Sequence, residues 1–169
     1  MGNPDLIVYD ELSNQIKTLE VRIHEESQAD PIIQRLRSLP GVGAILAAVI
    51  AAEIDQLERF RSPDKFCAYA GLVPTTHASG GHVHHGRLLP FCNRWLRWAF
   101  TEAAWVAITS SAYFGGIYQR HRARGKKANI AITIVARRLC RITWTVLHEN
   151  RCYSAMPPRQ TISPVAPAI

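Results

Sequence analysis

The feature that most constrains the fold of this chain is one long segment that is apolar on most of its sides. It runs from Arg94 to Ser110, and Asn93 before it belongs to a residue type that caps helix N-termini. Apolar residues recur along it at helical spacing, among them Trp95, Ala99, Ala103 and Val106. A helix with so little polar surface is expected at the centre of a core. We therefore expect its tryptophans to be core residues rather than a platform on which nucleic-acid bases stack.

Turn and capping residues divide the rest of the chain into further predicted helices. Ser62-Pro63-Asp64 places an N-cap, a first-turn proline and a first-turn carboxylate in order, as at the start of a helix. The other predicted helices are one that ends near Ser38, and segments at about 44–53, 113–122 and 128–149. The predicted fold class is therefore mainly α, with a helical domain over residues 31–150.

Two segments of this chain lack a helical period. Residues 72–91 are rich in Gly, Thr, His and Pro, and we expect a loop or a loose β-hairpin with Ser79-Gly80-Gly81 near its tip. Residues 151–169 contain four prolines, and we expect a disordered tail there.

The first 30 residues are predicted to form a coiled-coil-like helix. Apolar residues spaced 3, 4, 3 and 4 apart form an a/d stripe: Tyr9, Leu12, Ile16, Leu19 and Ile23. Asp30-Pro31 is expected to end the helix. The stripe either pairs with a partner helix, which would give a homo-oligomer, or packs on the chain's own domain as an ordinary amphipathic helix.

Charge is distributed unevenly along the chain. Residues 1–60 hold five Lys and Arg against ten Asp and Glu, whereas residues 61–169 hold fifteen against three. The net charges are thus −5 and +12, which together give the +7 of the whole chain. Such asymmetry predicts a basic half that meets a polyanion, although a soluble protein that is merely basic has the same composition.

Compartment and membrane association can also be predicted. The first residues have no signal-peptide pattern, and the longest apolar run, Ile45 to Ala52, is too short to span a bilayer. Cys67, Cys92, Cys140 and Cys152 form no CxxC pair, so we expect free buried thiols. These features predict a cytoplasmic protein that does not associate with a membrane.

The basic residues of the second half are the candidate nucleic-acid contacts. They follow the expected hairpin, cluster in the run QRHRARGKK at Gln119–Lys127, and continue on the last helix together with Arg141. The candidates are Arg87, Arg94, Arg97, Arg120, Arg122, Arg124, Lys126, Lys127, Arg137 and Arg138. Phosphate backbones are bound by many such point charges, so DNA or RNA is the expected partner, although a solvated basic surface is the alternative.

The sequence Leu39-Pro40-Gly41-Val42-Gly43 is a second candidate contact. Between two short helices it resembles the helix-hairpin-helix motif of DNA repair and recombination proteins, in which bare amide groups at a helix start hold a phosphate. Gly41 and Gly43 are the residues that would approach the backbone. A helix–helix corner without a ligand fits the same residues.

Ser79 is the candidate catalytic residue. A serine followed by two glycines offers an accessible hydroxyl to a large substrate, although Ser-Gly-Gly is commonly only a flexible turn. The nearby histidines are His77, His82, His84 and His85. No cysteine or carboxylate lies nearby to complete a structural zinc site, so we expect no metal there and favour a role as base or proton shuttle. A Ser–His–Asp hydrolase is disfavoured, because G-x-S-x-G is absent.

The order of these motifs resembles one family. LPGVG, FRSPDKFCAYAGLVP, ASGG, HGR, N-R-x-L-R-x-x-x-x-E-A-A-W, Y-x-R-x-R-x-x-G-K-K-A and V-A-R-R-L follow one another over residues 35–150. This set is similar to the carboxy-terminal domain of the bridge-RNA-guided insertion-sequence transposases, relatives of the Piv-type DNA invertases.

The resemblance implies a mechanism. In that family a serine in the matching loop attacks a DNA phosphodiester and becomes covalently linked to DNA, and Ser79 occupies that position. A RuvC-like domain with acidic residues for Mg²⁺ precedes the coiled coil, and a guide RNA is a further implied partner. No such domain precedes Tyr9 here, so we expect a truncated gene, a remnant or an excised domain that binds nucleic acid without completing transposition. A non-catalytic DNA- or RNA-binding module is the alternative.

The sequence also departs from the family at one point. The family has a Lys and a Gly shortly before the asparagine, where this chain has Pro90 and Cys92 before Asn93. A DNA contact at this point is therefore in doubt.

Overall fold

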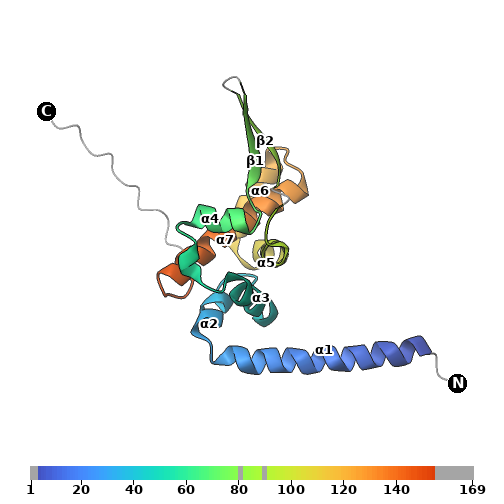
Figure 1. The fold of residues 1–169 in the computed structure, drawn as a ribbon. Helices are drawn as coiled ribbons and strands as arrows, with labels where there is room; N and C mark the ends of the chain where they lie inside the picture. The colour runs from blue at the N-terminus through green and yellow to red at the C-terminus, as the bar shows by residue number, and fades with distance from the viewer. Residues whose placement is uncertain (1–3, 80–81, 89–90, 155–169) are drawn as a thin grey trace.

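The computed structural model of the chain describes residues 4–79, 82–88 and 91–154. The fold is mainly helical, with one antiparallel β-hairpin (Figure 1). The helices are α1 (Pro4–Gln28), α2 (Pro31–Arg37), α3 (Ala44–Ile54), the 3-10 helix η1 (Leu57–Arg59), α4 (Pro63–Tyr69), α5 (Arg94–Ser110), α6 (Ala112–Ala123) and α7 (Ala128–His148). The hairpin consists of β1 (Pro74–Ser79) and β2 (His82–Leu88). The hairpin rises from one side of the helical domain, and α1 runs along the opposite side.

The predicted helix starts are confirmed by their capping hydrogen bonds. The side chain of Asn93 accepts a hydrogen bond from the Leu96 N–H of α5 (2.9 Å). Ser62 caps α4 by accepting from the Lys65 N–H (3.3 Å). Because a side-chain acceptor satisfies an N–H group that has no partner inside the helix, these residues fix where each helix begins.

Helix α5 lies at the centre of the fold, as predicted, and packs against α3, α6 and α7. Its fully buried residues are Leu96, Ala99, Phe100, Ala103, Ala104 and Ala107. The prediction that Trp95 and Val106 belong to the core is wrong, because these side chains are 62% and 53% exposed. The helix is apolar on two faces, and the other helices cover the face that holds Leu96, Phe100 and the four alanines.

Aromatic packing joins α4 and α7 to this centre. The rings of Phe66 on α4 and Phe100 on α5 meet edge to face with centroids 5.8 Å apart. The indole N–H of Trp144 on α7 donates to the Phe60 carbonyl just before α4 (3.1 Å). These contacts fix the positions of α4, which precedes the hairpin in the chain, and of α7, which carries several of the basic residues.

The turn between α2 and α3 packs directly on α5. Gly41 has a φ of +82°, and a Cβ at this position would lie 2.1 Å from the carbonyl oxygen of Ala103. This position therefore requires glycine for both its conformation and its space. Gly43, the N-cap of α3, has no neighbouring atom within 4 Å of the corresponding point.

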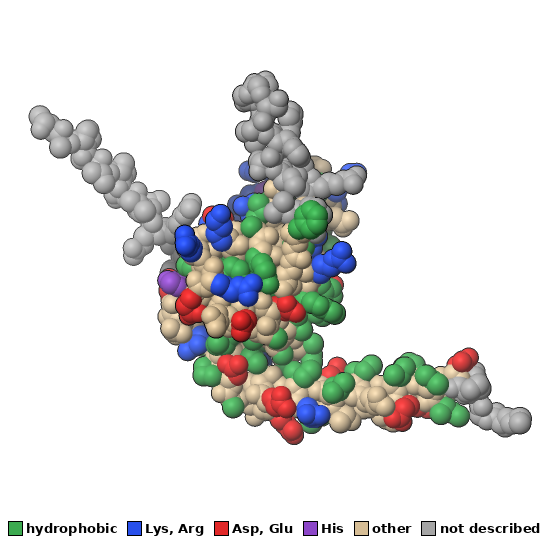
Figure 2. Space-filling view, viewed as in Figure 1, with side chains coloured by type: hydrophobic (Ala, Val, Ile, Leu, Met, Phe, Trp, Pro, Cys, Tyr) green, Lys and Arg blue, Asp and Glu red, His purple; other side chains and the backbone are tan. Residues whose placement is uncertain are grey.

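Helix α1 leaves its predicted apolar stripe uncovered. Tyr9, Leu12, Ile16 and Leu19 are each more than half exposed, and Ile23 is half-buried. Only the C-terminal end of the helix approaches the domain, where Ser27 is buried and α1 contacts α2 and α3. Figure 2 shows apolar side chains in a row along this helix. The interpretation in which the stripe packs on its own domain is therefore wrong for Tyr9–Leu19.

The cysteines and the chain end differ in part from expectation. Cys67 and Cys140 are buried free thiols, as predicted, but Cys92 is half-buried and Cys152 is exposed. In the described part of the predicted tail, Tyr153 donates its backbone N–H to the Ser38 hydroxyl (2.7 Å). The rest of that tail, residues 155–169, lies outside the described residues. Within the described chain, no helix is long and apolar enough to cross a membrane.

Candidate nucleic-acid interface

The hairpin presents Ser79 at its far end. Ser79 is the last residue of β1 and pairs in register with His82, the first residue of β2. His77 pairs with His84 two positions nearer the domain. The register thus places His82 beside Ser79 and His84 beside His77. Gly80 and Gly81 lie outside the described residues.

The end of α6 and the turn into α7 carry five exposed basic residues close together in the sequence, which we call the cation cluster. Its members are all exposed and are Arg120, Arg122, Arg124, Lys126 and Lys127. The turn is closed by the Arg122 guanidinium, which donates to the Lys126 carbonyl (2.7 Å), and by Gly125 with a φ of +78°. Between Glu102 and Glu149 the sequence contains no carboxylate, so α6 and α7 offer these cations no acidic partner of their own.

His121 reports the electrostatics of the cation cluster. Partial burial and the positive charges of Lys126, Arg124 and Arg120 lower the pKa of this imidazole below its usual 6.5. Burial is the larger cause, and the charges of Lys126, Arg124 and Arg120 add to it. The same three charges would attract the phosphates of a polyanion.

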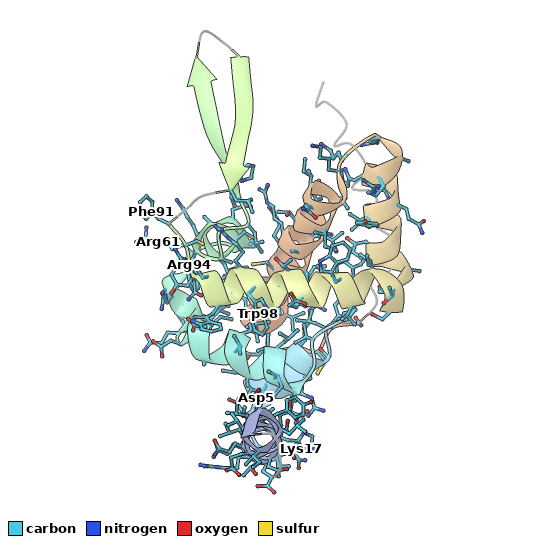
Figure 3. The ribbon with its side chains drawn as sticks, turned by 90° about the vertical axis from the view of Figure 1, so that its right-hand side faces the viewer. Asp5, Lys17, Arg61, Phe91, Arg94 and Trp98 are labelled. Atoms are coloured by element: carbon cyan, nitrogen blue, oxygen red, sulfur yellow. The ribbon has the colours of Figure 1, made fainter. Side chains whose placement is uncertain are left out.

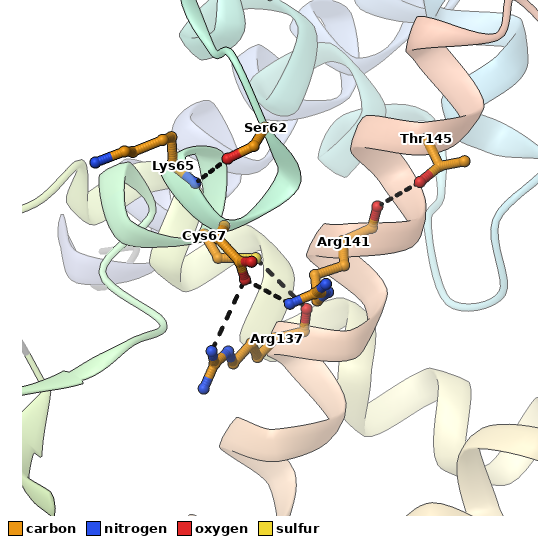
Figure 4. A network of polar contacts seen from close by, with 7 residues as sticks. Ser62, Lys65, Cys67, Arg137, Arg141 and Thr145 are labelled. Carbon is orange, nitrogen blue, oxygen red and sulfur yellow. Dashed lines mark hydrogen bonds and ion pairs between the residues drawn. The ribbon is translucent and has the colours of Figure 1, made fainter. Parts of the chain in front are cut away.

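The arginines farther along α7 are held by other side chains. Arg137 and Arg141 both pair with Asp64 on α4, and these two side chains are 38% and 39% exposed (Figure 4). The guanidinium of Arg138 donates to the Tyr113 hydroxyl (2.7 Å) and lies over that ring. Because two cations share one carboxylate, this part of α7 still has a net positive charge, but its arginines are less free to reach a ligand.

The cation cluster and the hairpin lie on one side of the helical domain. In two perpendicular views both rise from the side opposite α1, and Figure 3 shows them standing apart. Arg94, exposed in the first turn of α5, lies near the base of the hairpin, and the side chains of Arg97 and Cys92 both lie against Gly71. Arg87 lies on β2, one residue from its end. The structure therefore brings most of the predicted basic residues to this side.

Gly41 and Gly43 lie elsewhere. The turn that contains them is on the side of α5 that faces α1, away from the hairpin. A surface hollow of about 610 Å³ lies there, lined by Arg37, Val106 and residues of the turn. Any nucleic-acid contact at this turn would thus be separate from the one at Ser79 and the cation cluster.

The comparison with known proteins decides the family. The sequence profile of the "Transposase IS116/IS110/IS902 family" matches residues 33–119, which is more than half of the chain. The chain belongs to this transposase family. The matched region includes most of α2 and of α6 and every element between them, so it contains the hairpin with Ser79.

Individual relatives agree with this assignment. The chain is 30% identical over 158 residues to a "Probable family 20 transposase" of Pseudomonas aeruginosa, covering 85% of this chain and 45% of the relative. It is 31% identical over 144 residues to an "Insertion element IS110 uncharacterized 43.6 kDa protein" of Streptomyces coelicolor, covering 85% and 36%. A "Pilin gene-inverting protein" of Moraxella bovis is 29% identical over 118 residues, covering 69% and 37%. The chain thus spans less than half the length of these relatives.

Sequence reasoning missed an aromatic part of this transposase-family surface. Phe91 is 93% exposed, Trp95 62% and Trp98 42%. The available signal was the placement of Trp95 and Trp98 three residues apart, directly after Arg94, which puts them on one helix face beside a cation. We assigned the two tryptophans to the core because periodicity alone does not distinguish the two apolar faces of α5, and Phe91 lay in the segment expected to be a loop or hairpin.

Proposed function

We propose that this chain is the DNA-binding, serine-bearing half of a transposase, in which the Ser79 hydroxyl attacks a DNA phosphodiester. The observation that carries the proposal is the position of Ser79 at the far end of the hairpin, on the same side of the domain as the cation cluster. A projecting hairpin can bring a residue to a backbone phosphate while cations elsewhere hold the flanking DNA. The family assignment supports the same reaction class.

The proposed step exchanges one phosphoester bond for another. As the bond from the serine oxygen to phosphorus forms, the bond from phosphorus to the neighbouring deoxyribose oxygen breaks, and a deoxyribose hydroxyl leaves. The serine proton passes to a base, and the leaving oxygen takes up a proton. Because the phosphoester is kept as a link between Ser79 and DNA, the strand can be rejoined without another energy source.

A base is needed because a serine hydroxyl is a weak nucleophile. His82, the register partner of Ser79, is our candidate, because imidazole exchanges protons near neutral pH. Nearer the domain on the same two strands, His77 pairs in register with His84, so two further histidines lie close along the chain to Ser79 and His82.

Magnesium chemistry is assigned to another part of the full-length protein. The resemblance implies Mg²⁺ held by carboxylates of a RuvC-like domain. Two of the three carboxylates of the basic half are in ion pairs, Asp64 with Arg137 and Arg141 and Glu149 with Arg151, and Glu102 alone would not make a carboxylate cluster. No group of three potential metal-ligating side chains occurs within the part of the chain that the structure describes. We therefore assign no step to a metal in this chain and expect no cleavage by the chain alone.

Partners and compartment follow from the same proposal. DNA is the substrate, a guide RNA is a second nucleic acid that the cation cluster could hold, and α1 would pair with the same helix of a second copy. The exposed stripe on α1 supports that pairing, because a folded domain does not cover it. We place the protein in the cytoplasm, where it would meet the bacterial chromosome.

A second candidate function is a non-catalytic DNA- or RNA-binding module. The cation cluster favours it, because five exposed cations are sufficient to hold phosphates without any chemistry at Ser79. The two candidates are distinguished by mapping a covalent adduct. After a reaction of the full-length enzyme with donor DNA and nuclease digestion, mass spectrometry should find a phosphate on the peptide that contains Ser79. An unmodified Ser79 peptide in an enzyme that cleaves DNA would contradict the catalytic assignment.

A further inference from the structure

We propose that Phe91, Trp95 and Trp98, together with Arg94, form a platform on which unpaired nucleotide bases stack. We call these four residues the aromatic platform. The inference rests on the proposed function, because it assumes that the chain binds nucleic acid, and it names the form of nucleic acid that this face would hold.

The exposure of the three rings is the first observation. Phe91 is 93% exposed, Trp95 62% and Trp98 42%, whereas Phe100 and Ala104 on the opposite face of α5 are fully buried. The helix is thus packed normally on its inner face and presents its largest aromatic side chains to solvent. Large apolar surface left exposed in this way marks a binding site more often than scattered single residues do.

The arrangement of the rings suits stacking. Trp95 and Trp98 lie on one face of α5, with centroids 6.2 Å apart and planes at 88° to each other. Phe91 and Arg94 lie at the N-terminal end of the same helix, and Trp98 one turn farther along (Figure 3). A flat base could lie on the face of one indole while a neighbouring base or sugar meets the next ring.

The arginine beside the rings favours nucleotides over an apolar protein segment. Arg94 is exposed, and among the residues that the structure describes it has no ion-pair partner. Two carboxylates lie near this part of α5. Glu53 accepts a hydrogen bond from the Asn93 amide (2.5 Å). Glu102 is exposed one turn beyond Trp98, at the end of the platform away from Arg94. A nucleotide combines an aromatic face with a phosphate, which matches rings beside an arginine.

The location supports unpaired bases rather than an intact duplex. Phe91 follows Leu88, the last residue of the hairpin strand, by three positions, so the aromatic platform lies at the base of the element that carries Ser79. Bases inside a duplex are already stacked on both sides and expose only their edges. The platform therefore predicts tighter binding of single-stranded or flipped-out bases next to the site of strand exchange.

The test compares single-stranded and duplex DNA of equal length by fluorescence anisotropy of a labelled oligonucleotide. Trp95→Ala should weaken single-strand binding at least about fivefold, as expected for the loss of one stacked base. Duplex binding should change by less than about twofold, because its phosphates contact the cation cluster. Trp95→Phe, which keeps a ring, should recover most of the loss. Trp105→Ala is the matched control, since Trp105 is 40% exposed on the same helix but lies beside Tyr118, with centroids 6.1 Å apart.

The outcomes separate this inference from the proposed function. Failure of the unaltered chain to bind either DNA would contradict the nucleic-acid function itself. Salt-sensitive binding that Trp95→Ala leaves unchanged, or weakens equally for both DNA forms, would overturn the aromatic platform and leave the function standing. A Trp95→Ala chain whose sedimentation coefficient changes while single-strand binding does not would overturn it in favour of a protein-docking face.

Discussion

The α-carbon of Gly41 lies against the carbonyl oxygen of Ala103, so close that a Cβ on Gly41 would be 2.1 Å from that oxygen. The same Cβ would lie 2.9 Å from the backbone nitrogen of Ala107. The α2–α3 turn is thus seated on the backbone of α5, and both parts of this contact belong to the core on which the hairpin and the cation cluster are built.

Gly41→Ala should destabilise the fold by more than about 2 kcal/mol, because the φ of +82° and the backbone contact both oppose a side chain. Gly43→Ala is the control, since nothing lies within 4 Å of its added Cβ, and it should cost less than about 1 kcal/mol. Urea denaturation measures both. Equal stabilities of the two variants would show that the turn is not seated on α5 as described.

Helix α1 should hold two copies of the chain together through its exposed stripe. Leu12→Asp with Ile16→Asp should convert a dimer or higher oligomer into a monomer, because these side chains would face a partner helix. The free energy of unfolding of the monomeric domain should hardly change, since both positions are more than half exposed. Sedimentation velocity checks the mass. An unaltered chain that stays monomeric at high concentration would refute the pairing.

Nucleic-acid binding should depend strongly on salt. If the five residues of the cation cluster each contact a phosphate of duplex DNA, the plot of log binding constant against log salt should have a slope near roughly −4.5. Replacing both Lys126 and Lys127 with alanine should reduce the magnitude of that slope by about 2. Substituting Lys17 on α1 serves as the control. A slope near zero for the unaltered chain would exclude phosphate neutralisation as the main source of affinity.

The pKa of His121 should respond to the charges around it. Because burial and then Lys126, Arg124 and Arg120 lower this pKa, Lys126→Ala should raise it in the free protein. Since the folded-state pKa lies below the unfolded value, the stability from this group is complete above the usual pKa and is lost as pH falls through the folded value. An NMR pH titration of the histidine ring signals measures the shift. An unchanged pKa in Lys126→Ala would contradict the positive potential.

The sequence predicted the helices well because their starts depend on local chemistry. Asn93 and Ser62 form the expected caps, since a cap requires only a few neighbouring residues. Which face of α5 is buried depends instead on α3, α6 and α7, which lie far along the chain, so Trp95 was assigned to the core. Likewise, the pairing of Arg137 and Arg141 with Asp64 joins α7 to α4 and leaves no local pattern in the sequence.

The central claim is that Ser79 becomes covalently linked to DNA, and a denaturing gel with labelled donor DNA tests it most directly. In the full-length enzyme that includes the metal-binding domain, the unaltered protein should give a slower-migrating protein–DNA adduct and Ser79→Ala should give none. Ser79→Ala should still bind DNA and should change the free energy of unfolding by less than about 0.5 kcal/mol, because Ser79 ends a hairpin strand outside the core. Ser62→Ala, a change at a helix cap, is the control that should keep the adduct. An adduct that persists in Ser79→Ala would contradict the account and leave the non-catalytic binding module as the better description.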